Sequence, residues 1–149
     1  MNVSVRNQPE LRVAGIRHIG PYHEIGRAFG RLGGIAGAPP PGAQMIAIFH
    51  DDPDITPADR LRSDAVMTLP GAFATPNGLI EQRIPAGRYA SVVHKGPYEE
   101  LPNVWAQLKK EWLPASGHQA GQPGYEVYLN DPMKTAKPEL LTEIFLRLR

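Results

Sequence analysis

The chain has 149 residues, with 16 Lys and Arg against 15 Asp and Glu, 15 glycines, 16 prolines and no cysteine. The formal net charge of +1 argues against direct nucleic-acid binding, and the lack of cysteine excludes disulfides, thiol catalysis and cysteine-ligated metal sites. No apolar run approaches the ~18 residues of a membrane span, so we expect a cytoplasmic protein with no membrane association.

The first half of the chain predicts a strand, a helix and two further strands. Gly20-Pro21-Tyr22 ends the first strand, because proline cannot continue a central strand. An apolar stripe at helical spacing then begins at Ile25, and glycines predict its end at Gly33-Gly34 or at Gly37. The strands are expected over residues 12–19, 44–50 and 64–69.

The second half repeats this order. Residues 89–100 match residues 13–24, and two later segments match their counterparts in the same order with nearly the same spacing. We infer a tandem duplication within a single domain, with repeat 1 over 1–70 and repeat 2 over 78–149. Strands are expected over 88–95, 125–129 and 141–148, with a helix from Leu101 to Pro114 or Gly117 and a lead-in strand over 80–84.

Alternation along the last two strands predicts which side chains share a face of the sheet. The aliphatic face, expected against the helix, carries Tyr125, Val127, Leu129, Ile144, Leu146 and Leu148. The opposite face would then carry two carboxylates and two aromatic rings, Glu126, Tyr128, Glu143 and Phe145. Such a face suits a flat, hydrophobic cation, and ordinary cross-strand packing with solvated glutamates is the alternative interpretation.

The first repeat keeps the shape of this face but has less charge. Ala47 stands in the place of Glu126, and Phe49 in the place of Tyr128. The charge of a site would therefore come mainly from the second repeat. The histidines show no metal-ligand spacing and no phosphate-binding glycine motif is present, so neither a metal nor a cofactor is expected.

Three motifs together resemble the GyrI-like small-molecule-binding domain, also called the AraC-type effector-binding domain. They are Gly96-Pro97-Tyr98 before a helix, Tyr-Glu-Val-Tyr-Leu-Asn-Asp-Pro over 125–132, and the terminal segment 141–148. The resemblance covers nearly the whole chain. It implies an α+β fold, with two strand–helix–strand–strand units, an antiparallel sheet carrying two long helices on one face, and a ligand groove at the pseudo-two-fold axis.

The resemblance also implies drug or toxin sensing or sequestration, with Glu126 neutralising a lipophilic cation. The expected lining of the groove is Glu126, Tyr128, Glu143, Phe145, Trp105, Tyr98, Tyr22 and Phe49. We expect a binding protein rather than an enzyme. One alternative is a hydrolase of strained electrophilic toxins that uses Glu126, Glu143 and Tyr98, and another is a protein-interaction module for gyrase or for a regulator module.

Overall fold

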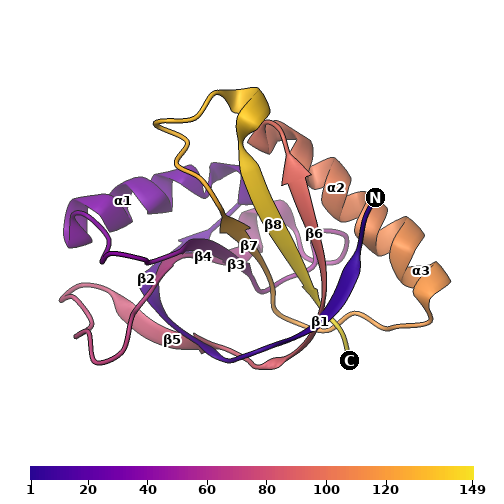
Figure 1. Cartoon of the computed structure of the whole chain (residues 1–149), viewed down its shortest axis with the longest axis horizontal. Coiled ribbons are helices and arrows are strands. Elements are labelled where there is room, and N and C mark those ends of the chain that lie inside the picture. The colour runs from indigo at the N-terminus through magenta and orange to yellow at the C-terminus, as the bar shows by residue number, and fades with distance from the viewer. The chain divides into compact units, whose positions relative to one another are not determined.

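The chain divides into two compact units, each of which contributes four antiparallel strands (Figure 1). The structure is a computed structural model that describes residues 1–149. Contacts divide the chain into two units, one of residues 9–86 and the other of residues 1–8 with 87–149. In each unit, helical segments pack against one face of four antiparallel strands. This arrangement confirms the expected α+β class and the antiparallel sheet. No helix has the length and apolar character needed to cross a bilayer.

The unit of residues 9–86 follows the expected order of elements and adds an edge strand. Its sheet has the order β3-β4-β2-β5, and α1 packs on β2 and β4. The helix ends where Gly37 adopts a φ of 69° and donates its N–H to the carbonyl of Gly33. The elements are β2 (Leu11–Ile19), α1 (Gly26–Ala36), β3 (Met45–Phe49), β4 (Arg62–Thr68) and β5 (Ile80–Ile84).

The second unit has the same topology, with the order β1-β6-β8-β7. Its helices cover an apolar cluster that includes Leu101, Leu108 and Ile144. The elements are β1 (Ser4–Gln8), β6 (Gly87–Lys95), α2 (Leu101–Gln107), α3 (Leu113–Ser116), β7 (Gly124–Tyr128) and β8 (Leu141–Arg147).

The edge strands do not follow the repeat boundaries expected from the sequence. β1 pairs with β6, so the start of repeat 1 completes the sheet of the second unit. β5 pairs with β2 in the same way, so the start of repeat 2 completes the sheet of the first unit. The strand register is equivalent in the two units, because Ala47 pairs with Ala65 in one unit and Glu126 pairs with Ile144 in the other.

The second helical segment contains a π turn between α2 and α3, over Leu108–Trp112. Leu113 donates its N–H to the carbonyl of Leu108, five residues earlier. Pro114 follows and has no N–H to donate, so the regular α-helical pattern cannot pass through this position. The helix then ends at Gly117, which adopts the left-handed conformation with a φ of 78°.

A buried carboxylate organises the non-helical face of the first unit. The side chain of Asp64 is 3% exposed and accepts hydrogen bonds from His50 Nε2 at 2.6 Å, Arg17 Nε at 2.5 Å and Gln82 Nε2 at 3.0 Å. Burial would raise the pKa of Asp64, but the hydrogen bonds from His50, Arg17 and Gln82 outweigh it and lower the pKa to about 2.

We expect Asp64→Asn to destabilise the protein by roughly 2 kcal/mol at pH 7, since the depressed carboxyl pKa reports stabilisation of the charged form. This contribution is complete above the unfolded-state pKa near 4 and is lost as the pH falls toward 2. Urea unfolding of the wild type and the variant, followed from pH 7 to pH 2, measures it. An equal stability difference at both pH values would contradict the assignment.

Candidate ligand-binding site

The strand register separates the four residues that the sequence places on one face. β7 pairs with β8 so that Glu126 lies opposite Ile144 and Tyr125 lies opposite Phe145. Opposed residues in an antiparallel pair share a face, so Glu126 and Tyr128 lie on the helix-facing side with the aliphatic residues of β8. Glu143 and Phe145 lie on the other side. The expectation of one common face is therefore wrong.

Glu126 lies between α2 and the sheet with both carboxylate oxygens hydrogen-bonded. It is 5% exposed. Trp105 donates its indole Nε1–H to Oε2 at 2.7 Å, and the Tyr128 hydroxyl donates to Oε1 at 2.7 Å. Both donors are neutral, and no Lys, Arg or His forms an ion pair with this carboxylate.

Gly124 makes room for the indole ring and was missed by the sequence reasoning. A Cβ at Gly124 would lie 3.0 Å from the Trp105 ring atom Cη2, which is tighter than most real contacts. The residue precedes Glu126 by two positions, so it faces the same helix. The sequence Gly-x-Glu-x-Tyr over 124–128 therefore places Gly124, Glu126 and Tyr128 on one face of the strand. This spacing is the sequence pattern from which Gly124 could have been predicted as part of the site.

Tyr98 supplies a second ring beside Tyr128. It begins the 3₁₀ turn Tyr98–Glu100 that follows Gly96-Pro97, and its ring centroid lies 5.3 Å from that of Tyr128 at a tilt of 58°. The structure thus brings together four of the expected site residues: Trp105, Glu126, Tyr128 and Tyr98.

Burial controls the ionisation of this cluster. It raises the pKa of Glu126, although the hydrogen bonds from Trp105 and Tyr128 oppose the shift. Burial also raises the pKa of Tyr128 well above its ordinary value, and the nearby negative charge of Glu126 adds to this effect. Burial therefore makes ionisation of Glu126 and of the Tyr128 phenol more costly than it is in water.

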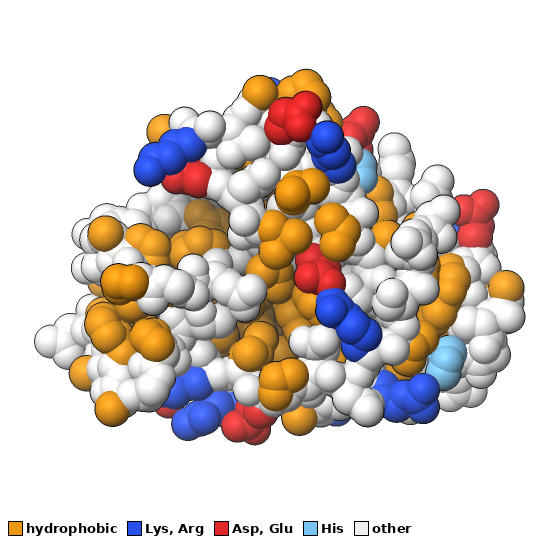
Figure 2. All heavy atoms as spheres, in the orientation of Figure 1, with side chains coloured by type: hydrophobic (Ala, Val, Ile, Leu, Met, Phe, Trp, Pro, Cys, Tyr) orange, Lys and Arg blue, Asp and Glu red, His pale blue; other side chains and the backbone are white.

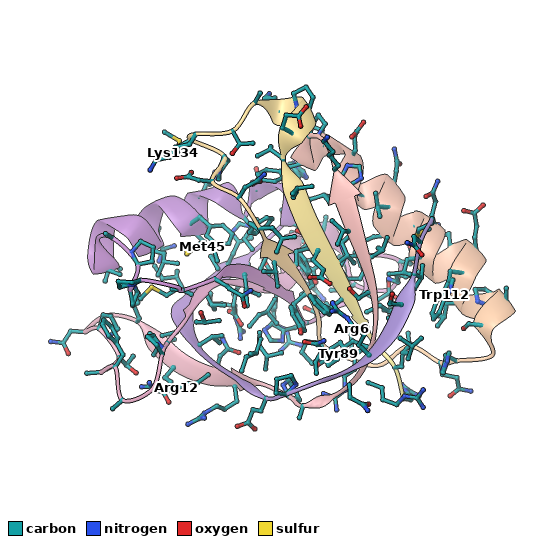
Figure 3. The ribbon with its side chains drawn as sticks, in the orientation of Figure 1. Arg6, Arg12, Met45, Tyr89, Trp112 and Lys134 are labelled. Atoms are coloured by element: carbon teal, nitrogen blue, oxygen red, sulfur yellow. The ribbon has the colours of Figure 1, made fainter.

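Glu143 and Phe145 belong to a different cluster on the opposite face. Ser91 donates to Glu143 Oε2 at 2.6 Å, and Arg6 of β1 forms an ion pair with the same oxygen. Phe145 stacks on Tyr125 with centroids 4.5 Å apart, and the Arg6 guanidinium lies 5.6 Å from its ring centroid. Figure 3 shows Arg6 and Tyr89 on one side of β1 and Trp112 on the helix beyond its other side.

The polar part of this second cluster forms a pocket of about 300 Å³, lined by Asn2, Ser4, Arg6, Ser91, Val93 and Glu143. Figure 2 shows an acidic and a basic side chain in contact among hydrophobic side chains over this sheet. Arg6 already neutralises Glu143, so this carboxylate is a poor partner for a further cation. The sequence reasoning missed Arg6 because β1 was not expected to join the second repeat.

The two aromatic residues expected from repeat 1 also contact each other. Tyr22 and Phe49 have ring centroids 4.7 Å apart, at the positions that correspond to Tyr98 and Tyr128. The Tyr22 hydroxyl donates to the Asp51 carbonyl at 2.7 Å and accepts from the Asp51 N–H at 3.0 Å. With Ala47 in the acidic position, this pair has no carboxylate, and its part in ligand binding stays a prediction.

Known proteins resemble this chain over most of its length. The DNA gyrase inhibitor of Escherichia coli K12 is 31% identical over 137 residues, which cover 88% of this chain and 87% of the relative. The EcmrR C-terminal domain superposes with a TM-score of 0.82 at 22% identity, covering 99% of this chain and 97% of that one. SAV2435, whose structure was solved with tetraphenylphosphonium bound, superposes with a TM-score of 0.70 at 13% identity, covering 100% and 94%.

These structural likenesses establish the fold, which contains the motifs at Gly96-Pro97-Tyr98 and at 124–128 in the places described above. The family model described as "GyrI-like small molecule binding domain" matches residues 1–149, from one end of the chain to the other. The chain belongs to the GyrI-like family of small-molecule-binding domains.

Proposed function

We propose that the protein binds hydrophobic cations at Glu126, as a sensor or as a sequestering protein. The observation that carries the proposal is a buried carboxylate with two neutral hydrogen-bond donors, neighbouring aromatic rings and no basic partner. A buried acid normally has a counter-charge in the fold. Here the counter-charge is missing, and a cationic ligand would supply it.

The aromatic residues favour the same class of ligand. Rings of Trp and Tyr attract cations to their faces, by about 2 kcal/mol or more where water is excluded. Trp105, Tyr98 and Tyr128 lie around Glu126 and combine apolar surface with this attraction. A neutral lipophile would gain the apolar contact without the charge pairing, so the cluster should prefer a cation.

The relatives support a small-molecule role. SAV2435 was solved with tetraphenylphosphonium, a permanent lipophilic cation, and the EcmrR domain belongs to a chain solved in a complex with DNA. Carried to this chain, these likenesses favour ligand sensing that is coupled to a regulator, or sequestration of the ligand by the chain itself.

Glu126→Gln should weaken tetraphenylphosphonium binding at least tenfold, about 1.4 kcal/mol, because it keeps the shape of the side chain and removes its charge. Isothermal titration calorimetry at pH 8 measures this. Glu143→Gln is the matched control, because the Glu143 carboxylate is paired with Arg6 on the opposite face of the sheet. The affinity of this variant for tetraphenylphosphonium should stay within about twofold of the wild-type value. Unchanged affinity in Glu126→Gln would refute the proposal, and equal losses in both variants would show that the effect is not specific to Glu126.

Gly124→Ala should weaken the same binding by roughly tenfold, the low end for disturbing a hydrogen bond to a charged group. The new methyl group would displace the Trp105 ring and misalign its N–H relative to Glu126 Oε2. Gly121→Ala serves as control, since a Cβ there makes only an ordinary 3.5 Å contact. Full affinity in a folded Gly124→Ala protein would show that the position of Trp105 does not matter for binding.

A gyrase-directed role is a second candidate because the gyrase inhibitor of E. coli matches this chain over nearly its whole length. In a supercoiling assay with purified gyrase, inhibition by the wild type would support it. Equal inhibition by Glu126→Gln would place the protein–protein interface away from the ligand site, and no inhibition by either protein would exclude the role for this chain.

A further inference from the structure

We infer that Glu126 holds a proton on Oε1 when the site is empty, and that a permanent cation binds in exchange for this proton. The inference rests on the proposed function, because it specifies how a cation binds to a site in which both oxygens of Glu126 already have hydrogen-bond partners.

The surroundings of Glu126 contain no cation to stabilise a bare carboxylate. α2 presents Trp105, and the turn before α2 presents Tyr98. β7 itself presents Tyr128, two residues after Glu126, and β8 presents the uncharged Ile144. Burial raises the pKa of both tyrosines, so neither becomes charged near neutral pH. Burial of an unpaired carboxylate is costly, and such a group takes up a proton instead.

Both carboxyl oxygens of Glu126 can keep their hydrogen-bond partners when the acid is protonated. An indole N–H is a donor only, so Oε2 must remain an acceptor toward Trp105 in both ionisation states. A phenol both donates and accepts, so the Tyr128 hydroxyl can accept from a protonated Oε1 across the same 2.7 Å separation. The direction of this one bond reverses, and both oxygens stay paired. The geometry therefore assigns the proton to Oε1.

The charge balance follows from this arrangement. When a permanent cation binds, the O–H bond of Glu126 dissociates, the proton leaves to solvent and Tyr128 again donates to the carboxylate. A neutral lipophile leaves the acid protonated and releases nothing. Below the pKa of Glu126 the proton competes with the cation, so affinity for the cation should rise by about tenfold per pH unit and level off above that pKa.

Calorimetry tests the exchange directly. Tetraphenylphosphonium is titrated into the full chain at pH values from 5 to 8, in pairs of buffers with different heats of ionisation. The wild type should show a buffer-dependent heat that corresponds to release of close to one proton at the acidic end, falling toward zero as affinity levels off. Binding with no proton release and no pH dependence would overturn the exchange and leave the proposed function intact. Absence of binding at every pH would overturn both.

Two variants connect the proton to Glu126. Glu126→Gln should bind weakly with no proton release, whereas Glu111→Gln, which changes an exposed glutamate in the π turn, should behave as the wild type does. Trp105→Phe removes a hydrogen bond that stabilises the carboxylate more than the neutral acid, so the midpoint of the pH dependence should move to higher pH. Proton release that persists in Glu126→Gln, or a Trp105→Phe midpoint that does not rise, would contradict the assignment.

Discussion

The proposed ligand site depends on the burial of one carboxylate, Glu126, under a helix. Glu126 occupies a position where its repeat counterpart is Ala47, and where neighbouring side chains form an aliphatic core. Burying the acid there costs free energy unless each oxygen is hydrogen-bonded. Trp105 and Tyr128 meet that requirement, and Gly124 leaves the space that lets the indole reach its acceptor.

The acidic side chains of the two units differ in whether the fold supplies a counter-charge. In the first unit Asp64 has a guanidinium, an imidazole and an amide as partners, so its charge is compensated within the fold. In the second unit Glu143, at the corresponding position, is paired with Arg6 and Ser91. Glu126 is the acid without an internal counter-charge. The two units thus contain two acids, Asp64 and Glu143, that are paired within the fold, and we propose that Glu126 is the one available to a cationic ligand.

Sequence reasoning predicted the order of strands and helices, and it named the four residues that the structure brings together, Glu126, Tyr128, Trp105 and Tyr98, because each depends on local periodicity or on a motif. It considered β7 and β8 as antiparallel neighbours, as they are, but assigned the side chains of β7 to the wrong faces. An apolar strand residue is usually assigned to the core, which placed Tyr125 and Val127 toward the helix. A shift of one residue exchanges the faces of a strand, and the real register instead turns the acid inward. The pairing of the edge strands could not be predicted either, because the contact of β1 with β6 joins parts of the chain that are far apart in sequence.

The exchanged edge strands give the protein a property that its repeats alone would not have. A cut in the segment between the halves, near residue 75, would leave the C-terminal fragment without β1 and the N-terminal fragment without β5. The C-terminal fragment would then expose the unpaired backbone of β6, and the N-terminal fragment that of β2. Exposed edge strands of this kind promote aggregation or pairing with a strand of another molecule. The repeats expected from the sequence, 1–70 and 78–149, therefore do not coincide with the compact units, because each unit takes its edge strand from the segment assigned to the other repeat.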